Sequence, residues 1–126
     1  MEIPISSFKD IPVIELSVNN NDLRFFLDSG AKLSYLPENF LSAYISSGTR
    51  EDFYPLIGKF RTECFRINTS LVNENFEVTY GILPEAIQTL LSYKHADGII
   101  GYDFFNNFKV MLDLMHNRLR FKRHIH

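Results

Sequence analysis

The stretch that decides the fold is residues 23–31, LRFFLDSGA. Apolar side chains alternate at Leu23, Phe25 and Leu27, which is the period-2 pattern of a β-strand with one buried face. The strand ends at Asp28, which enters a tight Ser-Gly turn of the kind that glycine permits. An Asp-Ser-Gly turn between strands is by itself a common feature, so a catalytic role for Asp28 depends on what accompanies it in the sequence.

Length and composition restrict the class of protein. The chain has 126 residues, which predicts one domain spanning residues 1–126. Twelve Phe and six Tyr predict a core rich in large rings. A formal net charge of −2 lacks the strongly basic balance typical of nucleic-acid binding, so no nucleic-acid partner is expected.

The sequence also predicts a compartment. Cys64 is the single cysteine, which precludes a disulfide within the chain. Residues 1–10 lack the apolar segment of a signal peptide, and no apolar run reaches the ~20 residues of a membrane-spanning helix. We therefore expect a cytoplasmic protein without a membrane partner.

Short strands dominate the expected secondary structure. Two hairpins are predicted, one from Ile11–Val18 and residues 23–27, the other from Lys109–Leu114 and Arg118–Phe121. Residues 52–69 predict strands with a bend, and Asn73–Asn75 predicts a turn between two further strands.

Two short helices are expected, and a third helical turn is possible. The segments are Pro37–Ser46, with Gly48 as its stop, and Pro84–Tyr93, with Ile87, Leu90 and Leu91 on one side. Asp97-Gly98 predicts a turn, and Asp103 is expected to cap a helical turn over residues 104–107. The fold class is therefore mostly β with two or three short helices.

A second motif lies about 70 residues after Asp28. Ile99 and Ile100 are followed by Gly101, a short helix and a strand pair. Together with the Asp-Ser-Gly turn, this order and spacing resemble the retropepsin family, the single-lobed aspartic proteases of retroviruses and their cellular and bacterial relatives. The resemblance covers residues 11–121 and implies a closed acid-protease barrel, in which the glycine lets an apolar strand pack closely against the catalytic loop.

The resemblance implies a role for each residue of the turn. Asp28 matches the catalytic Asp, and Ser29 matches the hydroxyl residue that locks two active-site turns together across a dimer. Gly30 matches the turn glycine, and Ala31 matches the small residue after it. The substrate-covering flap is expected within residues 52–63, and the tip candidates are Ile57, Gly58 and Lys59.

The implied chemistry needs two carboxylates, yet the chain has one Asp-[Ser/Thr]-Gly. A homodimer that acts on a peptide or protein substrate would supply the second Asp28. Two carboxylates ~3 Å apart share one proton, so that one takes a proton from water while the other hydrogen-bonds the substrate carbonyl. No metal or organic cofactor is expected.

Two other functions stay open. The first is a catalytically silent, dimeric peptide- or protein-binding module of the same fold, which is favoured by Tyr102 in place of a frequent arginine and by a flap with Gly58 as its one glycine. The second is a structural interaction domain in which Asp28 merely occupies a turn.

The remaining polar residues favour structural roles. The histidines lack the compact spacing of metal ligands; they are His95, His116, His124 and His126. A basic stripe of Arg118, Arg120 and Lys122 is typical of a protected edge strand. Cys64 is expected to be a small buried side chain. Asp97 and Asp103 could pair with Asp28, but a turn role and a cap role explain them better.

Overall fold

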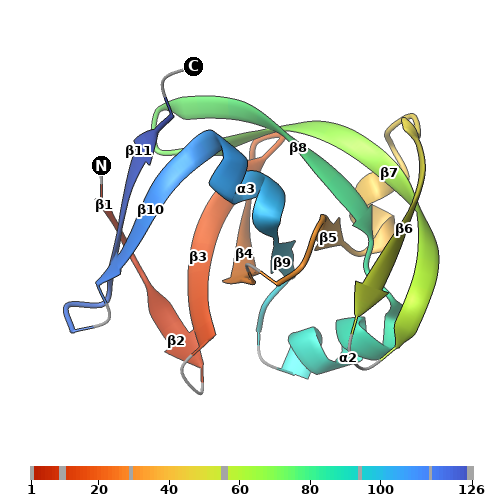
Figure 1. Cartoon of the computed structure of the whole chain (residues 1–126), viewed down its shortest axis with the longest axis horizontal. Coiled ribbons are helices and arrows are strands. Elements are labelled where there is room, and N and C mark those ends of the chain that lie inside the picture. Colours follow the sequence, from red (N-terminus) through yellow and green to blue (C-terminus); the bar gives the residue numbers. More distant parts are fainter. Residues whose placement is uncertain are drawn as a thin grey trace.

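A computed structural model of the protein describes residues 2–8, 11–28, 30–54, 57–93, 95–113 and 115–124. Strands dominate it (Figure 1). The strands are β1 (Glu2–Pro4), β2 (Ser6–Phe8), β3 (Ile11–Val18), β4 (Asn21–Leu27), β5 (Ser34–Leu36), β6 (Gly48–Tyr54), β7 (Gly58–Leu71), β8 (Glu74–Ile82), β9 (Gly98–Ile100), β10 (Phe108–Asp113) and β11 (Arg118–Arg123). The helices are α1 (Glu38–Leu41), α2 (Glu85–Tyr93) and α3 (Tyr102–Asn107).

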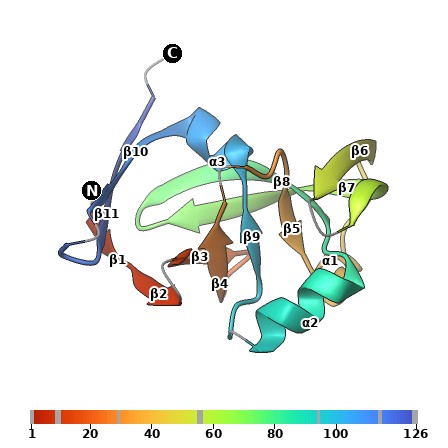
Figure 2. The same cartoon turned by 60° about the horizontal axis from the view of Figure 1, so that its bottom comes forward.

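Six of these strands close into a barrel. The hydrogen-bonded order is β3-β4-β9-β5-β8-β7, and a pairing of β7 with β3 completes the ring. Two neighbouring pairs are parallel, β4 with β9 and β5 with β8, and Figure 2 shows β4, β9 and β5 side by side. The expected closed, mostly-β barrel with short helices is therefore confirmed.

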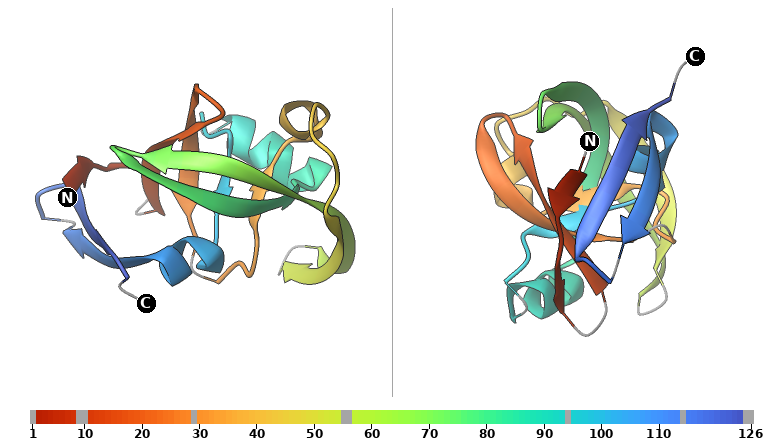
Figure 3. Two further views of the ribbon diagram at one scale, coloured as in Figure 1. Left: turned by 90° about the horizontal axis from the view of Figure 1, so that it is seen from above. Right: turned by 90° about the vertical axis from the view of Figure 1, so that its left-hand side faces the viewer.

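A second, three-stranded sheet joins the two ends of the chain. β1 pairs with β11, and β11 pairs with β10, so the expected C-terminal hairpin is confirmed. Figure 3 shows this sheet at one end of the molecule, beside the barrel. In a single chain the N-terminal strand therefore pairs with the chain's own C-terminal hairpin.

The apolar core has two parts that meet at the central strands. Phe25 and Ile100 belong to the first cluster, while Phe26 and Ile99 belong to the second, so adjacent residues of β4 and of β9 face opposite sides. The first cluster includes a chain of ring contacts from β8 through β10 to β11, with Phe76–Phe108 at 4.9 Å between centroids and Phe108–Phe121 at 5.5 Å. These contacts explain the high phenylalanine content.

The first helix is shorter than the sequence predicts. Only Glu38–Leu41 is helical, and Gly48 begins β6 with φ of 131° instead of stopping the helix. Two serines of the predicted helix bond to local backbone: the hydroxyl of Ser42 donates to the Asn39 carbonyl and that of Ser46 to the Gly48 carbonyl. Such side-chain bonds compete with helix formation.

Helix α2 matches its predicted bounds, but one side chain differs from the prediction. Ile87 and Leu91 are buried at i and i+4, while Leu90 is 43% exposed. The buried stripe of α2 is therefore narrower than expected, because only the residues directly above one another reach the core.

Candidate active site

Asp28 directly follows β4, and its backbone is tied to β9. Its N–H donates to the Ile100 carbonyl at 2.9 Å, and its own carbonyl accepts from Ala31 N–H at 3.2 Å. The Gly30 N–H donates to the carboxylate oxygen Oδ1 at 3.0 Å. The tight turn therefore fixes the orientation of the half-buried Asp28 side chain. Ser29 lies outside the described residues, so its predicted locking role stays a prediction.

The predicted apolar-apolar-Gly element lies against this turn. Ile99 and Ile100 are buried in β9, and the neighbouring Gly101 is buried too. A Cβ on Gly101 would lie 2.2 Å from the Leu33 carbonyl oxygen and 2.7 Å from that of Ala31. Gly101 thus allows a backbone-to-backbone approach that no other residue permits. Asp28 and Gly101 are brought together although they are far apart in sequence.

A network of polar side chains supports the loop that carries Asp28. The Ser34 hydroxyl accepts from Gly101 N–H at 3.0 Å and donates to Asp103 Oδ1 at 2.7 Å. The other oxygen of Asp103 accepts from Thr79 N–H at 3.2 Å. Burial raises the pKa of Asp103, although the Ser34 hydroxyl acts in the opposite direction. This network connects β5, β8 and the β9–α3 junction around the loop that carries Asp28.

The assignment of Asp103 as a helix cap was wrong. Gly101 occupies the N-cap position of α3, and no side chain caps that helix. Asp103 instead bonds Ser34, a residue 69 positions earlier. Asp97 holds β4 through a bond from Arg24 N–H to its Oδ2 at 2.9 Å. Gly98 is buried in β9, not placed in a turn, and its Cβ would lie 2.4 Å from the Tyr35 carbonyl oxygen.

The predicted flap stretch forms the β6–β7 hairpin. Among its tip candidates, Ile57 closes the turn through its N–H to the Tyr54 carbonyl at 2.9 Å. Gly58 has φ of 86°, a left-handed conformation that favours glycine, and the neighbouring Lys59 is exposed. Pro55 and Leu56, the residues between the strands, lie outside the described residues.

Sequence reasoning missed the residue of this hairpin that reaches the carboxylate. The Tyr54 hydroxyl donates to Asp28 Oδ2 at 3.3 Å. Burial, followed by the charge of Asp28 and its hydrogen bond, raises the pKa of Tyr54 to about 12. No local sequence motif signals this contact, because it joins residues 26 positions apart.

The hairpin is itself held to the barrel by a second tyrosine. The hydroxyl of Tyr35, which is buried in β5, donates to Oδ2 of Asp52, a buried residue of β6. The other oxygen of Asp52 accepts from Phe53 N–H at 2.7 Å. Phe60 of β7 packs against the Tyr35 ring with centroids 6.1 Å apart. These contacts hold the hairpin over the side of the barrel that carries Asp28.

The other polar residues singled out from the sequence lie elsewhere. Cys64 is buried as expected, and burial raises the pKa of its thiol. The edge-strand interpretation of the basic stripe was wrong, because β11 lies between β1 and β10. Arg118 and Arg120 lie near Glu2 of β1, the closer contact being Arg120 Nε to Glu2 Oε1 at 2.5 Å. His116 bonds Asp113 at 2.9 Å in the turn between β10 and β11. Across the described residues, no three His, Cys, Asp or Glu side chains gather closely enough to hold a metal ion.

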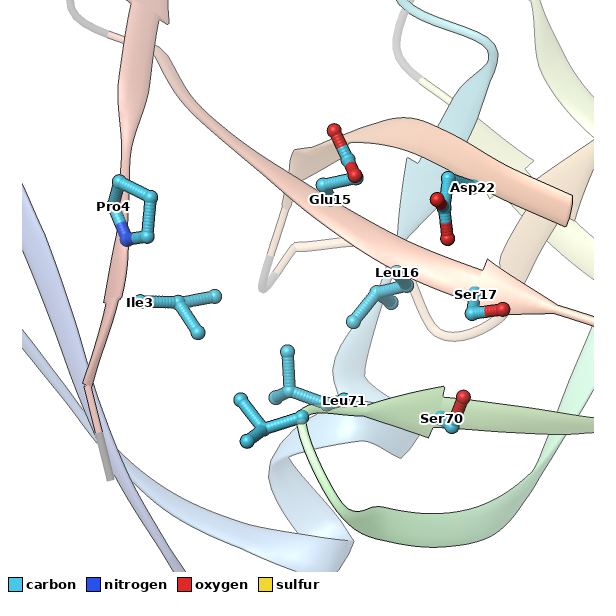
Figure 4. Close-up of a pocket in the computed structure, with 9 residues that line it drawn as sticks. Ile3, Pro4, Glu15, Leu16, Ser17, Asp22, Ser70 and Leu71 are labelled. Carbon is cyan, nitrogen blue, oxygen red and sulfur yellow. The ribbon is translucent and has the colours of Figure 1, made fainter. Parts of the chain in front are cut away.

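A cavity of about 350 Å³ lies between the terminal sheet and the barrel (Figure 4). Ile3, Leu16 and Leu71 converge in it, and the carboxylates of Glu15 and Asp22 lie along one side. Its lining includes neither the Asp28 turn nor the hairpin tip. The cavity is therefore separate from the candidate active site.

Within the described part of the chain, no helix has the length and apolar character needed to cross a membrane.

Solved structures share this fold. A retropepsin-like aspartic protease from Rickettsia conorii matches with a TM-score of 0.63 and 17% identity, covering 94% of this chain and 88% of that one. The retroviral protease-like domain of Ddi1 from Leishmania major matches with a TM-score of 0.54 and 19% identity, covering 87% and 86%. Simian foamy virus protease matches with a TM-score of 0.52 and 15% identity, covering 72% and 88%.

No protein-family model and no curated protein sequence matches the chain. At 15–19% identity, the structural matches describe the fold and not the chemistry. The chain has the retropepsin-like aspartic-protease fold, as the sequence resemblance implies.

Proposed function

We propose that this chain is an aspartic-type endopeptidase whose catalytic centre forms when two copies bring their Asp28 carboxylates together. The observation that carries the proposal is the turn at Asp28, where Gly30 N–H and the tie to β9 orient the carboxylate within a retropepsin-like barrel. Because one chain carries a single such turn, the second carboxylate comes from a second copy.

The proposed reaction is hydrolysis of a peptide bond. One ionised Asp28 takes a proton from water as the water oxygen bonds to the carbonyl carbon. The protonated Asp28 of the second copy hydrogen-bonds the carbonyl oxygen and then gives its proton to the leaving nitrogen, whereupon the C–N bond breaks. This chemistry needs one proton on the pair, so activity should rise toward mildly acidic pH.

The β6–β7 hairpin serves as the flap in this proposal. Its contacts with Tyr35 and Asp28 support this role, because they hold the hairpin over the turn that carries Asp28. An extended peptide would bind between the hairpin and the turn. The lone cysteine supports a reducing, cytoplasmic compartment for this activity. Ser29 would lie at the two-fold axis of the dimer.

The test is cleavage of an unfolded protein substrate from about pH 3.5 to 7 by the wild type and by Asp28→Asn. We expect cleavage that increases toward acidic pH and is lost in the nearly isosteric variant. Equal rates for the two forms would refute the proposal. Saturable binding of the substrate by both forms, without cleavage, would assign the chain to the silent peptide-binding module instead.

A further inference from the structure

Both oxygens of Asp28 accept hydrogen bonds within their own chain. Oδ1 accepts from Gly30 N–H at 3.0 Å, which belongs to the tight turn itself. Oδ2 accepts from the Tyr54 hydroxyl at 3.3 Å, which comes from β6, an element that is distant in sequence and outside the barrel ring. The first donor orients the carboxylate, and the second connects it to the flap hairpin.

The position of Tyr54 is fixed by the hairpin around it. Asp52, two residues earlier on β6, is buried and bonded to the Tyr35 hydroxyl. Because alternate residues of a strand point to the same face, Asp52 and Tyr54 both face the barrel, while Phe53 between them is 57% exposed. The Tyr35–Asp52 contact therefore holds the strand in the register that directs Tyr54 to Asp28.

The Tyr54 hydroxyl keeps its proton across the working range of pH. Its pKa is raised to about 12 by burial, by the charge of Asp28 and by the bond to it. Two other carboxylates of this region bond other partners: the buried Asp52 accepts from Tyr35, and the half-buried Asp103 accepts from Ser34. Tyr54 is thus a permanent donor to Asp28. Because a hydrogen bond has a preferred geometry, this donor restrains the orientation of the Asp28 carboxylate.

We propose that Tyr54 is a positioning residue for the catalytic base, whose hydroxyl donates to Asp28 Oδ2 and holds this carboxylate in the orientation in which it accepts a proton from water. The inference rests on the proposed function. Tyr54 gives up no proton in the reaction: the water proton goes to the ionised Asp28, and the leaving nitrogen receives its proton from the Asp28 of the second copy.

The kinetic test compares Tyr54→Phe with the wild type. The variant keeps the ring and removes only the donor, so we expect kcat to fall by about ten- to a hundredfold, as for loss of a hydrogen bond to a charged group. KM should change much less, because the variant keeps the aromatic ring that faces the site. The matched control is Tyr93→Phe, the same change on an 86% exposed side chain of α2, which should leave both constants unaltered.

Unchanged or increased kcat in Tyr54→Phe would overturn the role of Tyr54 and leave the proposed function standing. If the wild type cleaves nothing, the proposed function fails and the proposed role of Tyr54 fails with it.

A second measurement does not depend on activity. With 3-fluorotyrosine at every tyrosine, the residue 54 ¹⁹F resonance is the one missing from Tyr54→Phe. We expect Asp28→Asn to move this resonance and to leave that of residue 93 in place. A residue 54 resonance that does not move would overturn the contact itself.

Discussion

Replacing Gly101 with alanine tests whether the two sequence motifs are in contact. Gly101 has φ of −104°, which any residue can adopt, so the cost of a side chain there is collision and not backbone strain. The new Cβ would lie 2.2 Å from the Leu33 carbonyl oxygen, whereas real Cβ atoms essentially never come within 3.0 Å of another heavy atom. That carbonyl must retreat by about 1 Å, and the loop that carries Asp28 must move with it.

Overpacking of this kind costs about 1–3 kcal/mol, and the upper part of the range applies because the opposing atoms are backbone. For a chain of this length, the loss corresponds to a fall in Tm of about 4–12 °C. We expect Gly101→Ala to show this fall together with shifted amide resonances of Gly30 and Ala31. Thermal and urea unfolding measure the loss of stability, and two-dimensional amide spectra measure the shifts.

The matched control is Gly58→Ala. Gly58 has φ of 86° and no atom within 4 Å of its would-be Cβ, so its cost is left-handed backbone strain of about 1–2 kcal/mol without a collision. The Gly30 and Ala31 resonances should stay in place in this variant. If Gly101→Ala is as stable as the wild type and leaves both resonances unmoved, the reasoning about the close approach is refuted.

Three further predictions concern the polar contacts around the site. Ser34→Ala should lower the free energy of unfolding by about 1–3 kcal/mol, because it leaves Gly101 N–H without its partner; urea unfolding that matches the wild type would contradict this. Burial raises the pKa of Asp103 above its usual 3.8, so the native state binds more protons and its stability falls as pH rises through the folded-state value. The stability of Asp103→Asn relative to that of the wild type should therefore rise with pH above about 3.8 and then level off. A difference in Tm that is constant with pH would refute the raised pKa. Tyr35→Phe should leave the buried Asp52 carboxylate short of a donor, at a cost of about 1–3 kcal/mol, and should speed amide exchange in β6 and the adjoining start of β7; protected amides there would show that the hairpin is held by packing alone.

Many of the strands and the Asp28 turn could be predicted because their signals are local. Alternating apolar residues specify β4, and the tight turn after it needs only the adjacent glycine. Ile99, Ile100 and Gly101 form a compact motif as well. Apolar periodicity and turn chemistry predict the strands and hairpins, whereas the closed barrel is implied by the resemblance to the retropepsin family.

The polar contacts of the site could not be predicted, because they join residues without a shared local pattern. Ser34 and Asp103 are 69 positions apart, and Tyr54 and Asp28 are 26 apart. Local reasoning assigned Asp103 to a helix cap, a role that its residue type and position suited equally well. Tyr54 differs from the other tyrosines only through the register of the hairpin, which depends on the buried Asp52.

The central claim is that two chains share one catalytic centre. A peptide analogue with a single secondary alcohol in place of the scissile bond mimics the tetrahedral intermediate and binds between two carboxylates. Isothermal titration calorimetry at mildly acidic pH should give one analogue bound for every two chains, with binding lost in Asp28→Asn. One analogue for each chain, or equal binding by the variant, would contradict a centre built from a pair of Asp28 residues.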